Sequence, residues 1–184
     1  MTPEQRAEES AGYDWWVHEP RRLAADRNEI RRRFPALVWT SRDSGEWEGE
    51  LPLWPFDRSR PPGLDNLLRG QGLRVLVQCG QAYPVVAPKL FALEPEPALH
   101  QRLLHRWHVN SDGSLCLLAD PTRWTNRMSL GDLLQKAAGW RIEYELMVAG
   151  AVESMTANGI VSDDAIDHLI SQAATGYRND NDDC

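Results

Sequence analysis

The chain has 184 residues, 42% of them hydrophobic and 26% charged, and a formal net charge of −7. This length and composition suit one folded domain with a sizeable core, and the negative charge argues against a protein that binds nucleic acid by covering its phosphates. The three cysteines, Cys79, Cys116 and Cys184, are too few and too scattered for a disulfide scaffold or a zinc site, and no run approaches the ~20 apolar residues of a membrane-spanning helix. We therefore expect a cytoplasmic protein with no metal, no cofactor and neither nucleic acid nor membrane among its partners.

The pattern of polar and apolar residues predicts a single domain over residues 19–175. Residues 1–18 are expected to form a flexible N-terminal segment, and residues 176–184 a disordered acidic tail. The domain begins with a helix, which starts at Glu19-Pro20-Arg21 because proline is favoured in a first helical turn, and which Pro35 ends.

Six arginines lie on this helix, and they permit two interpretations. They can form an ordinary solvated helix face, or they can form a docking face for an acidic partner. The six residues are Arg21, Arg22, Arg27, Arg31, Arg32 and Arg33.

Four segments after the helix have the apolar or alternating character of β-strands. They are Ala36 to Thr40, Trp47 to Leu53, Leu73 to Cys79 and Val85 to Leu93. Residues 55–72 interrupt this meander with a loop that holds one short helical piece, and a long irregular segment follows over residues 94–124. Ser129 then caps a long helix, and Ser162-Asp163-Asp164 caps a short final one. This order predicts an α+β fold in which antiparallel strands are backed by helices.

The irregular segment carries the most informative pattern in the chain. Cys116 ends the polar turn Asp112-Gly113-Ser114 and is flanked by leucines, while His108 precedes it and Trp124 follows it by eight residues each. A thiol held in this way combines a fixed position with access, which favours a nucleophile that carries an acyl group as a thioester. The alternative is a buried loop cysteine without chemistry, which is also what we expect of Cys79 at the end of an apolar strand.

The order of elements, the Tyr83-Pro84 turn before Pro88 and the run from Asp112 to Leu117 resemble those of ubiquitin-conjugating enzymes over about residues 20–150. In that family a tryptophan follows the catalytic cysteine by eight residues, as Trp124 does here. The resemblance implies a ubiquitin-conjugating-enzyme-like fold, with an N-terminal helix, an antiparallel β-meander, an irregular active-site segment and long C-terminal helices.

Three departures from the family pattern resemble its bacterial branch, which occurs in antiphage defence operons of the CBASS or Bil kind. The family's His-Pro-Asn signature falls on Arg106-Trp107-His108, so that a histidine stands in place of the asparagine. The loop over residues 55–72 is an addition, and the helix after Trp124 is longer than usual.

The resemblance implies that Cys116 accepts the C-terminus of a ubiquitin-like modifier, or of a partner such as a nucleotide cyclase, from a separate activating enzyme and passes it to an amine of a target protein. His108 would stabilise the oxyanion of this transfer or hold the loop in shape. Asp120 and Asp112 could deprotonate the incoming amine, although Asp112 before a glycine is more typical of a turn. The arginine helix would be the docking face for the activating enzyme. The residues that would support the active segment by packing are Trp124, Tyr83 and Pro84.

Two hypotheses from other classes stay open. The chain could be a catalytically silent scaffold of the same fold, although such proteins usually lack the cysteine. It could also be a thiol hydrolase that uses Cys116 and His108, which would need an acid to orient the histidine.

The basic residues add one more observation, because only Lys89 and Lys136 are lysines and the other eighteen are arginines. Biased codon usage explains such a composition. A sharper interpretation is that an enzyme that moves acyl groups to amines benefits from offering few amines of its own.

Overall fold

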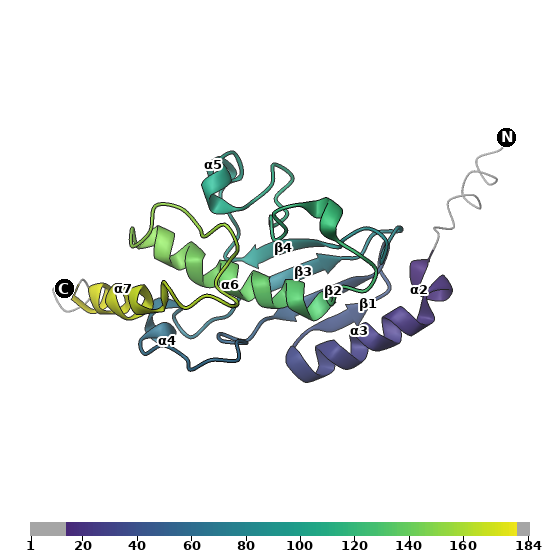
Figure 1. Ribbon diagram of the computed structural model, residues 1–184, viewed down its shortest axis with the longest axis horizontal. Coiled ribbons are helices and arrows are strands. Elements are labelled where there is room, and N and C mark those ends of the chain that lie inside the picture. Colours follow the sequence, from purple (N-terminus) through teal and green to yellow (C-terminus); the bar gives the residue numbers. More distant parts are fainter. Residues whose placement is uncertain (1–13, 180–184) are drawn as a thin grey trace.

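The computed structural model describes residues 14–179, which form a mixed α+β structure around a four-stranded antiparallel sheet (Figure 1). The strands lie in the sheet in their chain order, as a meander. They are β1 (Val38–Thr40), β2 (Glu46–Glu50), β3 (Arg74–Gln78) and β4 (Lys89–Glu94). The α+β class with antiparallel strands, as predicted from the sequence, is confirmed.

One row of cross-strand neighbours shows which face of the sheet is buried. Trp47 of β2 lies opposite Trp39 of β1 and Val77 of β3, and Val77 lies opposite Leu90 of β4. Trp47, Val77 and Leu90 are all buried. Because side chains alternate between the two faces of a strand, Val75 is buried on the same face, two residues before Val77.

The fourth strand starts later than the sequence predicts. Val85 and Val86 belong to a turn in which both backbone N–H groups donate to the carbonyl of Ala82, and both side chains are exposed. Pro88 has no N–H to donate to a sheet, so regular pairing begins only at Lys89. The predicted strand is therefore four residues too long at its start.

An aromatic cluster orders the N-terminal elements. In α2 (Trp15–His18), Trp15 is fully buried, its Nε1 donates to the carbonyl of Ser44 at 2.8 Å, and its ring packs edge-on against Tyr83 with the centroids 4.7 Å apart. Residues 14–18, which the sequence assigns to a flexible segment over residues 1–18, thus contain a short helix with a buried tryptophan, and residues 1–13 lie outside the described residues. The next helix, α3 (Pro20–Arg33), lies between the two prolines that the sequence predicts as its limits.

The long helix α6 (Leu130–Val148) backs the sheet (Figure 1). Its N-cap is Ser129, whose Oγ accepts a hydrogen bond from the backbone N–H of Asp132 at 3.1 Å, as the sequence predicts. Leu133, Leu134 and Ala137 belong to the same core cluster as the buried strand residues. This packing fixes which face of α6 is left to meet the segment that carries Cys116.

A second, smaller core lies along the other half of α6, where Ile142 and Leu146 are fully buried. The inserted loop over residues 55–72 contributes α4 (Leu64–Leu67), which packs against α7 (Asp167–Asn179) at one end of the molecule (Figure 1).

The last helix is longer than the short helix that the sequence predicts. Ile170 and Ala174 are buried in the second core, and α7 continues to Asn179, so its last four residues overlap the tail that the sequence predicts from residue 176. Residues 180–184 of that tail, Cys184 included, lie outside the described residues. Within residues 14–179 no helix combines the length and the apolar character needed to cross a membrane.

Candidate active site

The segment between β4 and α6 holds Cys116 against the edge of the sheet. It contains three short helical pieces, α5 (Leu99–Arg102), η1 (His105–Trp107) and η2 (Pro121–Arg123). Leu115 is buried, and its backbone N–H donates to the carbonyl of Leu90 in β4 at 2.7 Å. Val109 pairs with Leu115 as an isolated antiparallel bridge. The residue before the cysteine is therefore anchored both to the core and to the sheet.

The turn before the cysteine is built around Asp112. One carboxylate oxygen accepts hydrogen bonds from the backbone N–H and the Oγ of Ser114, at 3.0 and 2.6 Å, and the other pairs with Lys89 Nζ at 2.7 Å. The bond from Lys89, followed by those from Ser114, lowers the pKa of Asp112 far below its usual value. A carboxylate held in this way shapes the turn and is a weak base, so the geometry favours the turn role over proton abstraction.

Cys116 and His108 are direct neighbours. The backbone N–H of Cys116 donates to the carbonyl of His108 at 2.8 Å, and the cysteine side chain is exposed. His108 has a left-handed φ of 48° and is half-buried, and burial lowers the pKa of its imidazole. The imidazole is therefore neutral at pH 7, when one ring nitrogen can donate a hydrogen bond and the other can accept a proton.

Two cavities meet at the cysteine. The larger, of about 230 Å³, has a mostly apolar surface but includes the polar side chains of His108, Lys136, Glu143 and Asn158 beside Cys116 and Leu117, and it is called the polar cavity below for these four residues. The smaller, of about 150 Å³, is mostly apolar and is lined by Pro88, Leu90, Leu115, Cys116, Leu118 and Leu133 among others. Cys116 thus borders two small cavities, and titratable side chains other than its own line only the larger one.

One face of α6 forms a wall of the polar cavity. Lys136, Trp140 and Glu143 follow one another at four and three residues, a spacing that places them on the same side of a helix. Lys136 Nζ donates to the carbonyl of Leu117 at 3.3 Å, and Trp140 Nε1 donates to the carbonyl of Trp107 at 2.9 Å. Sequence reasoning missed these residues, although polar side chains at helical spacing within an otherwise buried helix were a signal for them.

Glu143 of α6 holds a second segment, residues 155–159, against the polar cavity. Its carboxylate is buried and accepts hydrogen bonds from both the hydroxyl and the backbone N–H of Thr156. Burial raises the pKa of Glu143, and the bonds from Thr156 oppose that rise. Because Met155 N also donates to the carbonyl of Arg106 at 3.1 Å, residues 155–159 are held over the cavity from two sides.

Asp120, predicted as a catalytic residue, lies apart from this arrangement. It is exposed, lines neither of the two cavities, and accepts hydrogen bonds from the hydroxyl and the backbone N–H of Thr122 at 2.6 and 2.9 Å. These bonds lower its pKa. This geometry favours a turn role for Asp120, and its part in deprotonating an amine stays a prediction.

The other predicted support residues pack beneath the active segment. Trp124 is buried, and its Nε1 donates to the carbonyl of Pro84 at 2.9 Å. The hydroxyl of Tyr83 donates to Asp26 at 2.7 Å and accepts from Arg22 at 2.5 Å. These contacts join α3 to the turn at Tyr83-Pro84 and to Trp124. Cys79 lies in the same core, where burial raises the pKa of its thiol.

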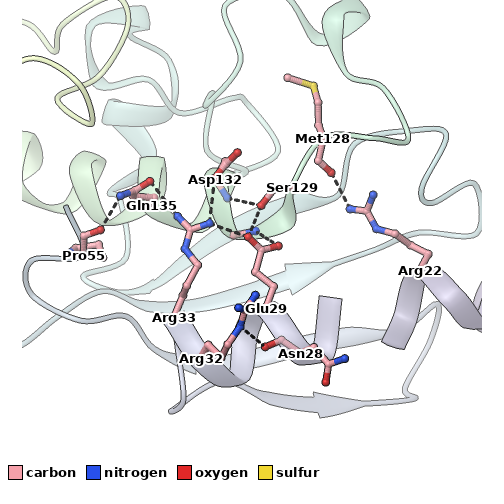
Figure 2. A network of polar contacts seen from close by, with 11 residues as sticks. Arg22, Asn28, Glu29, Arg32, Arg33, Pro55, Met128, Ser129, Asp132 and Gln135 are labelled. Carbon is pink, nitrogen blue, oxygen red and sulfur yellow. Dashed lines mark hydrogen bonds and ion pairs between the residues drawn. The ribbon is translucent and has the colours of Figure 1, made fainter. Parts of the chain in front are cut away.

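The arginines of α3 do not act as one exposed face. Arg22 donates to the carbonyl of Asn126. It also donates to the carbonyl of Met128, and Arg33 contacts Glu29 of its own helix at 2.7 Å and Asp132 of α6 at 3.0 Å (Figure 2). Both tie α3 to the start of α6. The exposed basic surface of α3 is thus smaller than the six-arginine face that the sequence predicts. It comprises Arg21, Arg27, Arg31 and Arg32.

Within residues 14–179 no group of three or more His, Cys, Asp or Glu side chains is arranged to hold a metal ion. Comparison of the chain with family models, with curated proteins and with solved structures finds no significant match.

Proposed function

We propose that this protein is a conjugating enzyme of the ubiquitin-conjugating type, in which Cys116 carries the C-terminus of another polypeptide as a thioester. The observation that carries the proposal is the setting of Cys116. Its side chain is exposed while its chain is anchored at Leu115, it is bonded through the backbone to His108, and it faces two adjoining cavities. The order of a helix, a β-meander, an active segment and a long helix supports the corresponding fold.

The first step is the exchange of one thioester for another. The Cys116 thiolate attacks the carbonyl carbon of the incoming thioester, a new C–S bond forms, and the thiolate of the donor leaves. The small volumes on either side of the sulfur, about 230 and 150 Å³, suit an extended tail with small residues near its end rather than a folded surface.

In the second step, an amine attacks the thioester carbon, and the carbonyl oxygen becomes an oxyanion before the thiolate leaves. His108 can donate a hydrogen bond to this oxyanion from one ring nitrogen or take a proton from the amine with the other. Its neutral state at pH 7 follows from burial, which lowers its pKa. His108 is therefore the residue that we assign to the transfer step.

The partners are an activating enzyme, the modifier or cyclase tail that it supplies, and a target protein. Arg21, Arg27, Arg31 and Arg32 offer an accessible basic surface for an acidic face of the activating enzyme. The resemblance to the bacterial branch of the family supports a setting in antiphage defence in the cytoplasm.

Trapping tests this proposal. The protein is co-expressed with the candidate activating enzymes and modifiers encoded by neighbouring genes, and intact masses are measured. The wild type should carry an adduct that thiols release, Cys116→Ser an ester that thiols do not release, and Cys116→Lys an amide. Cys184→Ser serves as the matched control and should behave as the wild type. An adduct that persists in Cys116→Ala, or the absence of any adduct with every candidate pair, would overturn the proposal.

The two other hypotheses have weaker support in this arrangement. A hydrolase needs an acid that orients His108, and Glu143 in the same cavity has both oxygens occupied by Thr156. A silent scaffold gives no reason for an exposed thiol beside an imidazole. A Cys116→Ala variant that retains the full biological effect would favour the scaffold.

A further inference from the structure

The polar cavity contains one of the two lysines of the chain. Lys136 Nζ donates to the carbonyl of Leu117 at 3.3 Å, and Cys116 Sγ lies 4.0 Å from the carbonyl oxygen of Leu118. The amine and the thiol are thus held at neighbouring peptide groups, and both face the same cavity of about 230 Å³. The chain has eighteen arginines and only two lysines. Of these two lysines, both of which lie within the described residues, Lys136 is the one that lines a cavity together with the candidate nucleophile.

The other lysine is placed quite differently. Lys89 belongs to β4, and its ammonium pairs with Asp112 at 2.7 Å on the outer side of the turn, with 61% of its side chain exposed. It lines neither cavity at the sulfur. Lys89 therefore provides a matched control for any chemistry assigned to Lys136.

We propose that Lys136 is a self-acylation site, to which Cys116 transfers its acyl group when no outside amine arrives. The inference rests on the proposed thioester function. The neutral amine of Lys136 attacks the thioester carbon, a C–N bond forms, the C–S bond breaks, and the Cys116 thiolate leaves. The proton lost by the nitrogen passes to the neutral imidazole of His108, which lines the same cavity, and from there to water.

Proximity is the reason that this reaction competes with transfer to a target. An amine held beside a carbonyl reacts as though it were present at a concentration far above that of any free amine in solution. The face of α6 fixes Lys136 there, because Trp140 on the same face is bonded to the carbonyl of Trp107.

Self-acylation would regulate the enzyme. The product has a free Cys116 thiol but carries the tail, now joined to Lys136 by an amide, in the cavity that the next thioester must enter. An enzyme that is loaded in the absence of a target would thus switch itself off, and thiols would not reverse the change.

A synthetic peptide thioester tests the inference without the natural partners. The full-length protein is incubated with the mercaptoethanesulfonate thioester of acetyl-Gly-Gly, and intact mass is recorded before and after neutral hydroxylamine, which cleaves thioesters but not amides. The wild type should first gain a labile acyl group on Cys116 and then a resistant one, which tryptic mapping places on Lys136. Lys136→Arg should keep the labile adduct with a half-life about tenfold longer and lose the resistant one.

Three controls complete the design. Lys89→Arg should behave as the wild type, and Cys116→Ala should acquire neither the labile nor the resistant adduct at a comparable rate. Lys136→Met removes the positive charge as well as the amine and should, like Lys136→Arg, lose the resistant adduct. A wild-type adduct that is wholly labile, or a resistant adduct that persists in Lys136→Arg, would overturn the inference while the proposed function stands. Failure of Cys116 to acquire any labile adduct would overturn both.

Discussion

Replacing Tyr83 by phenylalanine removes a single hydroxyl from a buried charged network. That hydroxyl donates to the Asp26 carboxylate at 2.7 Å and accepts from Arg22 at 2.5 Å, while the ring packs against Trp15 with the centroids 4.7 Å apart. Burial raises the pKa of Asp26, and the hydrogen bonds from Tyr83 and Arg22 oppose that rise. The variant would keep the ring contacts and the Arg22–Asp26 pair, but the carboxylate would lose a donor in a site that water does not reach.

The expected cost follows from the charge of the partner. A hydrogen bond to a charged group contributes about 1.5–3 kcal/mol, against about 0.5–1.5 kcal/mol for a neutral pair. Tyr144→Phe is the matched control, because Tyr144 is also buried and donates to the neutral amide oxygen of Gln101 at the longer distance of 3.3 Å. Tyr83→Phe should therefore lower the free energy of unfolding by about 1 kcal/mol more than Tyr144→Phe does.

Urea unfolding, followed by tryptophan fluorescence and circular dichroism, measures both variants against the wild type. In a domain of this size each kcal/mol lowers Tm by about 2–4 °C, so Tyr83→Phe should melt about 3–12 °C below the wild type. Equal losses in the two variants, or a loss in Tyr83→Phe below about 0.5 kcal/mol, would refute the assignment of a stabilising role to the Tyr83 hydroxyl.

Three further predictions concern stability and transfer. Burial by itself would raise the pKa of Glu29, but its hydrogen bonds hold that pKa below the usual value. The wild type should therefore have a higher free energy of unfolding in urea than Glu29→Gln at neutral pH, and this difference should vanish as pH falls below about 5. Gly72→Ala would place a Cβ 1.9 Å from the carbonyl oxygen of Leu51, and thermal unfolding should show a loss of about 3 kcal/mol because backbone must move. His108→Ala should slow discharge of a Cys116 thioester to free lysine by on the order of 10²-fold, as followed by intact mass. In the wild type the discharge rate, divided by the fraction of lysine that is neutral at each pH, should fall only below about pH 6.5, because the protonated ring of His108 cannot accept a proton and burial lowers the pKa of that ring.

Local sequence signals were sufficient for the elements that local physics controls. Pro20 and Pro35 bound α3 because proline is tolerated in a first turn and cannot continue a helix, and Ser129 caps α6 through a single side-chain hydrogen bond. The Asp112 turn likewise depends on contacts within two residues, apart from Lys89. Each of these features could be predicted because the atoms that decide it are close in the chain.

Other features depended on partners that are distant in sequence. Trp15 is ordered only because it meets Tyr83 and the carbonyl of Ser44, and α7 is long because it packs on α4. The arginine pattern predicted one surface, but Arg22 and Arg33 find carbonyl and carboxylate partners about a hundred residues away and turn inward. Neither burial nor pairing of this kind is encoded in a local pattern.

The candidate site divides in the same way. From the sequence alone came Cys116, its register with His108 and the turn that presents the thiol, because these belong to one continuous segment. Only the tertiary structure decided that Lys136 and Glu143 line a cavity together with that cysteine. Their position depends on the rotation of α6 about its axis as its apolar face packs on the sheet, and on the place where residues 155–159 pack against α6. Both are set by contacts between distant segments, which the hydrophobic periodicity of one segment does not predict.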